Sequence, residues 1–82
     1  MVVVQHMRFN PPTVTVSPGQ TVVWKFDDLH VAHDVVSQPG GPLHSNLQQA
    51  GSYRHTFQEP GTYRYVCTLH LADGMIGDVI VR

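Results

Sequence analysis

The 82-residue chain is short of cysteine, of basic residues and of long apolar runs, and each shortage excludes a class of protein. With one cysteine the chain can form no internal disulfide, so its single thiol needs another reason to be present. Five Lys and Arg, scattered along the sequence, do not make the basic surface that nucleic-acid binding requires. No segment is long and apolar enough to span a membrane. The sequence therefore predicts neither a nucleic-acid partner nor a membrane span.

The first residues, Met1–Val4, are too short and lack the basic start of a signal peptide. This leaves either a cytosolic protein or one whose export signal has been removed. We expect the second, with the protein periplasmic or otherwise extracytoplasmic. A chain of this size buries only about 60% of its unfolded surface. We therefore predict one domain over residues 1–82 and a monomer.

Residues that favour helices are scarce and valine is abundant, a balance typical of an all-β protein. Turn signals rich in Pro and Gly separate short stretches that alternate apolar and polar residues. Residues 38–42 form one predicted loop, and residues 43–51 are compatible with a short helix or an irregular excursion. The predicted strands are 2–9, 13–17, 21–26, 33–37, 52–57, 62–68 and 77–82. The pattern predicts an all-β, Greek-key β-sandwich of about seven to eight strands.

Alternation also predicts which side chains face the core. Trp24 shares a strand face with Val22 and Phe26, and Cys67 shares one with Tyr65. The thiol is therefore predicted to point inward. A lone cysteine usually packs as a small hydrophobic residue, and an inward Cys67 fits that interpretation as well as it fits a buried metal ligand.

Three side chains of metal-ligand type lie close together near the C-terminus. Cys67, His70 and Met75 fall within nine residues. Thiolate, imidazole and thioether suit copper in a trigonal site with a weak axial sulfur. A histidine among small and apolar loop residues has no evident structural role, whereas a methionine near a loop end is often a core filler. Taken together, the three residues predict a metal-binding loop.

A trigonal site needs one further nitrogen, and the chain has six histidines. His33 is the first candidate because it opens the predicted strand 33–37 after a polar connection. His30 is the competitor, three residues earlier, and the pattern alone leaves the choice open. The sequence predicts surface or rim positions for three others, namely His6, His44 and His55.

Five stretches of the sequence carry a family resemblance: Phe9–Pro11, Val16–Trp24, His33–Val36, Pro60–His70 and Gly74–Val81. In these stretches the chain resembles plastocyanin-type cupredoxins, which are small blue copper proteins. The spacing from Cys67 to His70 to Met75 is that of plastocyanins and pseudoazurins, whereas amicyanins have a shorter gap between the histidine and the methionine. The resemblance implies the cupredoxin fold, one type 1 copper ion, and His33 rather than His30 as the fourth ligand beside Cys67, His70 and Met75.

The sequence departs from the family pattern at several positions. Leu69 stands where a proline commonly precedes the loop histidine. Asp34 replaces the Asn or hydroxyl residue that often follows the first histidine and braces the cysteine loop. Phe26 stands where an Asn is common. The chain is also shorter than most plastocyanins, and we expect the missing residues to fall between residues 37 and 52. We find no counterpart of the acidic patches of plant plastocyanins.

The function that the resemblance implies is single-electron transfer by a Cu(I)/Cu(II) couple, not enzymatic catalysis. Electrons would pass through the exposed edge of His70, with redox partner proteins docking on a small apolar face near His70, Leu69 and Leu71. A simpler interpretation is that the two leucines are scattered exposed hydrophobic residues.

Other functions use the same residues. Copper storage or delivery would employ the same four ligands. A zinc site of Cys67, His70 and His33 would leave Met75 unexplained. An enzyme with a Cys–His pair would need an accessible thiol, which an inward Cys67 does not offer. The short length of the chain and its complete ligand set argue against a domain of a larger copper oxidase. A metal-free adhesion module would leave that ligand set without a purpose.

Overall fold

The computed structural model describes residues 1–37 and 41–82, so residues 38–40 of the predicted loop lie outside the described part of the chain. The described residues form eight strands and one short 3-10 helix, η1 (Leu71–Asp73). The strands are β1 (Val2–Gln5), β2 (Arg8–Asn10), β3 (Thr13–Val16), β4 (Thr21–Asp27), β5 (Val36–Ser37), β6 (Ala50–Thr56), β7 (Gly61–Val66) and β8 (Ile76–Val81). No helix among these residues has the length and apolar character needed to cross a bilayer.

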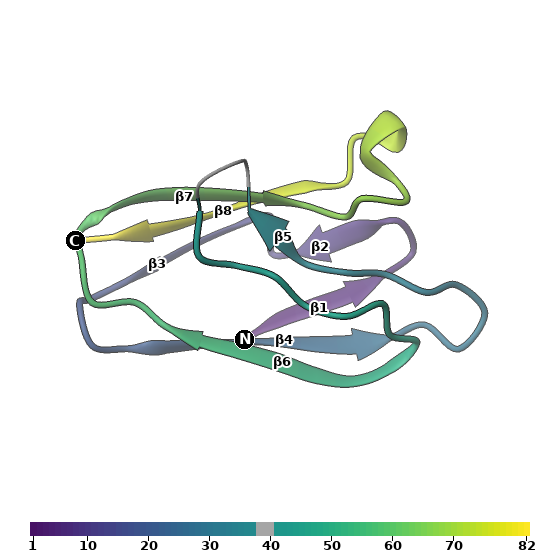
Figure 1. The fold of residues 1–82 in the computed structure, drawn as a ribbon, viewed down its shortest axis with the longest axis horizontal. Helices are drawn as coiled ribbons and strands as arrows, with labels where there is room; N and C mark the ends of the chain where they lie inside the picture. The colour runs from purple at the N-terminus through teal and green to yellow at the C-terminus, as the bar shows by residue number, and fades with distance from the viewer. Residues whose placement is uncertain (38–40) are drawn as a thin grey trace.

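The strands form two four-stranded sheets that lie one over the other (Figure 1). One sheet has the order β2-β1-β4-β6 and the other the order β3-β8-β7-β5. β1 pairs with β4 and β3 with β8 in parallel, and the remaining pairs are antiparallel. The chain changes from one sheet to the other after each strand from β2 to β6, so most neighbours within a sheet are distant in sequence, and only β1–β2 and β7–β8 are consecutive. The predicted all-β sandwich is confirmed.

The prediction of one strand over residues 2–9 was wrong. The structure divides it into β1 and β2, whose pairing of Gln5 with Arg8 leaves His6 and Met7 as a two-residue turn. Both turn residues have positive φ, 53° and 60°. Such mirror-image turns match the twist of a hairpin but usually carry Asn or Gly. Histidine and methionine are not typical of such a turn, so the sequence did not predict this hairpin.

Residues 33–37 and 41–49 are mostly irregular. Only Val36–Ser37 of the predicted strand 33–37 pairs as a strand, and His33 makes an isolated bridge to Gln48 instead. The stretch that the sequence left undecided is an irregular excursion without a helix, and β6 begins earlier than expected, at Ala50. Because His33 pairs outside the two sheets, its position depends on this excursion.

The core between the sheets is built on stacked aromatic rings. The predicted inward face of β4, which includes Trp24, is buried as expected. Tyr65 meets the Trp24 ring edge-on at 5.3 Å and the Phe9 ring at 4.6 Å between centroids. Gly77 on β8 lies under the Tyr65 ring so closely that an added Cβ would collide with the phenol. This packing and the pairing of β7 with β8 continue to Val66 and Ile76, where both strands reach the loop that contains η1.

Candidate metal centre

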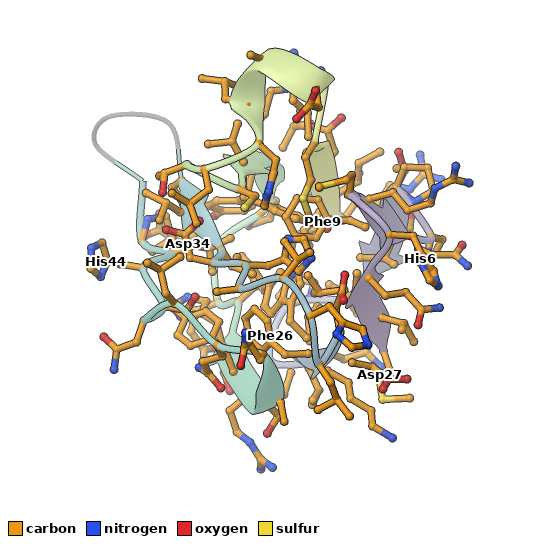
Figure 2. The ribbon with its side chains drawn as sticks, turned by 90° about the vertical axis from the view of Figure 1, so that its right-hand side faces the viewer. His6, Phe9, Phe26, Asp27, Asp34 and His44 are labelled. Atoms are coloured by element: carbon orange, nitrogen blue, oxygen red, sulfur yellow. The ribbon has the colours of Figure 1, made fainter. Side chains whose placement is uncertain are left out.

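Three connections meet at one end of the sandwich. They are the β1–β2 turn, the loop after β4 and the loop that contains η1, all at the right-hand side of Figure 1. Figure 2 looks onto this end, with His6 and His44 on opposite outer sides. Both of these histidines are exposed, and His55 is half-buried, as predicted.

The loop between β7 and β8 is closed by its own backbone. The amide of Cys67 donates to the carbonyl of Met75 at 3.1 Å, and the amide of His70 donates to the carbonyl of Cys67 at 3.2 Å. Gly74 ends η1 in the left-handed conformation, φ 77°, which lets the chain turn back toward β8. Since a left-handed residue costs little only for glycine, the local sequence and the loop shape agree.

His33 reaches the same place from far up the chain. Its amide and carbonyl pair with Gln48 at 3.0 and 2.8 Å, and its side chain is fully buried. Nδ1 of His33 lies 3.8 Å from Sγ of Cys67, and Nδ1 of His70 lies 3.3 Å from the same sulfur. The three donor atoms all lie within 4.8 Å of one another, an arrangement that could hold a metal ion. His30 is exposed and outside this group.

Met75 is buried in the same core cluster as Cys67. Its amide donates to the carbonyl of His70 at 3.3 Å, in addition to the bond from Cys67. The main chain of Met75 is therefore bonded to both of the other ligand-type residues of the loop. This places the four residues singled out in the sequence in one neighbourhood.

The electrostatics of Cys67 combine two opposing effects. Burial raises the pKa of the Cys67 thiol, because a low-dielectric setting disfavours the charged thiolate. The backbone amides of Asp34, Leu69 and His70 act in the opposite direction and lower that pKa. The backbone around the sulfur therefore opposes the effect of burial on the Cys67 thiol.

Asp34 ties the segment of His33 to the loop of Cys67. Its two carboxylate oxygens accept hydrogen bonds from the amide of Thr68 at 2.7 Å and from the Thr68 hydroxyl at 2.6 Å. Figure 2 labels Asp34 at this end of the molecule. The expected bracing role of the residue after the first histidine is therefore filled here by a carboxylate.

Asp28 is a neighbour of His33 that the sequence did not reveal. Its Oδ2 lies 3.1 Å from Nε2 of His33, on the side of the ring opposite Nδ1. The hydrogen bond with His33 is the main cause that lowers the pKa of the Asp28 carboxyl group. The sequence predicts only a polar connection at residues 27–30. An acid five residues before a histidine carries no recognisable spacing, so nothing in the sequence pointed to this contact.

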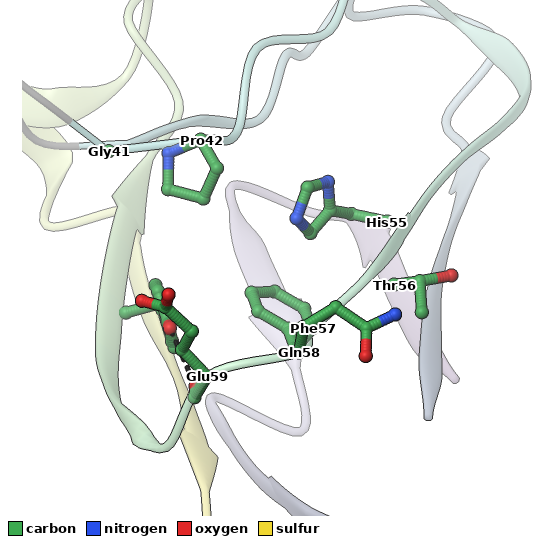
Figure 3. Close-up of a pocket in the computed structure, with 8 residues that line it drawn as sticks. Gly41, Pro42, His55, Thr56, Phe57, Gln58 and Glu59 are labelled. Carbon is green, nitrogen blue, oxygen red and sulfur yellow. Dashed lines mark hydrogen bonds between the residues drawn. The ribbon is translucent and has the colours of Figure 1, made fainter. Parts of the chain in front are cut away.

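A surface hollow of about 460 Å³ lies elsewhere, beside the β6–β7 turn (Figure 3). Pro42 and His55 face each other across it, and none of the four predicted ligands lines it. The hollow therefore plays no part in the metal centre.

Comparison with known proteins gives a consistent result. Residues 2–82 match the family model described as copper binding proteins, plastocyanin/azurin family. A halocyanin from Natronomonas pharaonis is 38% identical over 90% of this chain, and a Synechococcus plastocyanin is 33% identical over 94%. The chain spans 48% of that halocyanin and 65% of that plastocyanin. The crystal structure of amicyanin from Paracoccus versutus superposes with a TM-score of 0.86 at 31% identity, covering 99% of this chain and 78% of the amicyanin.

The chemistry of the donor set agrees with the match. One thiol and two imidazoles with converging donor atoms, together with a buried thioether residue on the same loop, fit a single type 1 copper ion. The match covers nearly every residue of both sheets and of the loops between them. The chain therefore belongs to the plastocyanin/azurin family of copper binding proteins.

Proposed function

We propose that the protein is a type 1 copper protein that carries single electrons between redox partners and is not an enzyme. His33, Cys67, His70 and Met75 are the proposed ligands. The observation that carries the proposal is the convergence of two Nδ1 atoms on the Cys67 sulfur, at 3.8 and 3.3 Å. The names of the relatives, halocyanin, plastocyanin and amicyanin, support the same function.

A bound copper ion would supply the Cu(I)/Cu(II) couple. Cys67 would provide the electron-rich thiolate, with His33 and His70 as nitrogen donors. Met75 would be the weak thioether donor, whose identity tunes the reduction potential. The protein's part is to keep these donors in one arrangement in both oxidation states.

Several long-range contacts support that rigidity. The Asp34–Thr68 hydrogen bonds, the pairing of His33 with Gln48 and the Cys67–Met75 bond each fix one ligand segment to another part of the chain. Because each segment has a separate anchor, loss of one donor's bond to the metal would not release the others. Little has to move when an electron arrives or leaves.

The proposed docking face surrounds His70, whose ring is only half-buried. Leu69 and Leu71 are 58% and 50% exposed on the same loop, and Ile76 is 37% exposed where the loop enters β8. Small interfaces are typical of weak electron-transfer encounters, which must release quickly. We propose that redox partner proteins dock here. We also propose that the protein is a monomer in one domain and works outside the cytoplasm, which gel filtration and cell fractionation would test.

The first experiment is titration of the apoprotein with Cu(II) under visible spectroscopy. An intense blue thiolate-to-copper band should appear with one equivalent, and Cys67→Ser should abolish it. His33→Ala should also lose the band, whereas the control His30→Ala should keep it, because His30 lies outside the donor group. A missing band in the wild type, or a band that survives in Cys67→Ser, would exclude the type 1 site.

Two further measurements separate electron transfer from the alternatives. Met75→Gln should keep the blue colour but shift the reduction potential, and an unchanged potential would remove Met75 as the axial ligand. Reversible voltammetry with retained copper supports electron transfer. Rapid loss of copper to a chelating acceptor would instead favour copper storage or delivery.

A further inference from the structure

The Asp28 carboxylate is held in place by more than its contact with His33. Oδ2 accepts from the amide of His6 at 3.2 Å, and Oδ1 lies 3.4 Å from the amide of His30. The Asp28 side chain is only 13% exposed. The main-chain amide of Asp28 donates to the carbonyl of Gln49 at 3.1 Å. The carboxylate thus contacts the β1–β2 turn and two further residues of its own loop, and the main chain of Asp28 is tied separately to Gln49. That is more than an incidental surface pair requires.

The His6–Met7 turn adds a second, independent observation. Both residues adopt the left-handed region, where a side chain with a Cβ is strained. This turn brings the His6 amide to within 3.2 Å of Asp28. Persistent strain of this kind is maintained only where the surroundings require the conformation, and it gathers at functional sites.

The hydrogen bond from His33 defines which ring nitrogen is free. An ionised carboxylate can only accept, so Nε2 of His33 carries the hydrogen that Asp28 receives. In the neutral ring, Nδ1 then keeps its lone pair, and Nδ1 is the atom that lies 3.8 Å from the Cys67 sulfur. The contact therefore selects the tautomer as well as the orientation of the ring.

We propose that Asp28 is a positioning residue of the metal centre, which holds His33 as an Nδ1 donor and favours Cu(II) over Cu(I). A carboxylate behind a ligating imidazole raises the basicity of the ligand, and loss of such a partner typically weakens metal binding by about 10–100-fold. The extra negative charge stabilises the more highly charged oxidation state. This inference rests on the proposed copper function.

The test compares Asp28→Asn with Asp27→Asn. Each variant removes one carboxylate from adjacent residues, but Asp27 is exposed, and Figure 2 shows it toward the outside of this end of the molecule. Asp28→Asn should weaken Cu(II) more than Cu(I) by about tenfold or more. A tenfold difference corresponds to a rise of about 59 mV in a one-electron reduction potential. Asp27→Asn should leave the potential close to that of the wild type. Equal potentials in the two variants would overturn the inference while leaving the copper function intact.

A second measurement uses the wild-type apoprotein, so it requires neither copper nor an amino-acid substitution. In the nitrogen-15 spectrum of the wild-type apoprotein, His33 should be the Nε2–H tautomer, with a slowly exchanging ring proton. An Nδ1–H tautomer, or rapid exchange of that proton, would contradict the positioning role. If the wild type took up no copper at all, the proposed function would fail, and the tautomer would still decide whether Asp28 holds the ring.

Discussion

Asp34 and Thr68 lie 34 residues apart in the sequence and are joined by two hydrogen bonds, from the amide and from the hydroxyl of Thr68. The first follows His33 and the second follows Cys67, so the pair connects the two segments that supply the buried ligands. The contact joins the segments that carry the proposed ligands and does not involve the donor atoms themselves.

Removal of this connection should cost stability. Asp34→Ala leaves the Thr68 amide and hydroxyl without their acceptor and should lower the free energy of unfolding by about 2–4 kcal/mol. Thr68→Val loses only the hydroxyl bond and should cost about 1 kcal/mol. Urea unfolding of both apoproteins measures the difference. If Asp34→Ala were no less stable than Thr68→Val, the bracing role of the carboxylate would be wrong.

The contact between Gly77 and Tyr65 predicts a packing defect. Gly77→Ala places a methyl group against the phenol ring of Tyr65, and that ring is fully buried and packed against Phe9 and Trp24. We expect a loss of about 1–3 kcal/mol in the free energy of unfolding, as for other overpacked cores. A double-mutant cycle with Tyr65→Leu checks the cause, because the second substitution should relieve part of the cost. Strict additivity of the two changes would mean that the ring is not what Gly77 accommodates.

Tyr65 predicts a loss of stability at alkaline pH. Burial raises the pKa of its hydroxyl to about 12, above the ordinary value of 10.0. The unfolded chain therefore releases this proton first, and stability is complete below pH 10 but falls as the pH rises toward 12. The slope from this group approaches about 1.4 kcal/mol per pH unit.

Tyr65→Phe provides the matched comparison. The Tyr65 hydroxyl is buried without a hydrogen-bond partner among the described residues, so its removal should cost little at neutral pH. Urea unfolding of the apoproteins between pH 9 and about 11.5 should show a shallower decline in the variant. If the free energy of unfolding fell equally with pH in both proteins, groups other than Tyr65 would cause the loss of stability at alkaline pH.

The proposed docking face predicts a charge-sensitive electron exchange. Leu71→Lys introduces a cation into the exposed apolar residues around His70 and should slow electron self-exchange between oxidised and reduced protein several-fold at low salt. Gln58→Lys is the control, since it adds the same charge in the turn before β7, at the end of that strand away from Cys67. NMR line broadening in mixtures of the two oxidation states measures the rate. Equal slowing by both substitutions would show a net-charge effect and remove the local docking role.

Local signals carried much of the prediction. Cys67, His70 and Met75 lie on one short connection, so their proximity follows from spacing alone, and Gly74 supplied the turn that the connection needs. Period-two alternation placed Trp24 and Tyr65 in the core because neighbouring side chains in a strand must face opposite sides. Family resemblance was needed to choose His33 over His30, since one follows the polar connection 27–30 and the other ends it, only three residues apart.

The order of residues alone therefore predicts the sandwich, its buried faces and the ligand types of one loop, all of which depend on neighbours in the chain. The tertiary structure alone decided the hidden β1–β2 hairpin, the Asp34–Thr68 connection and the placement of Asp28 behind His33. These depend on segments that meet only after two sheets have packed. The physical reason is that a hydrogen bond between distant segments leaves no period or spacing in the sequence, because its geometry is set by the packing that brings them together.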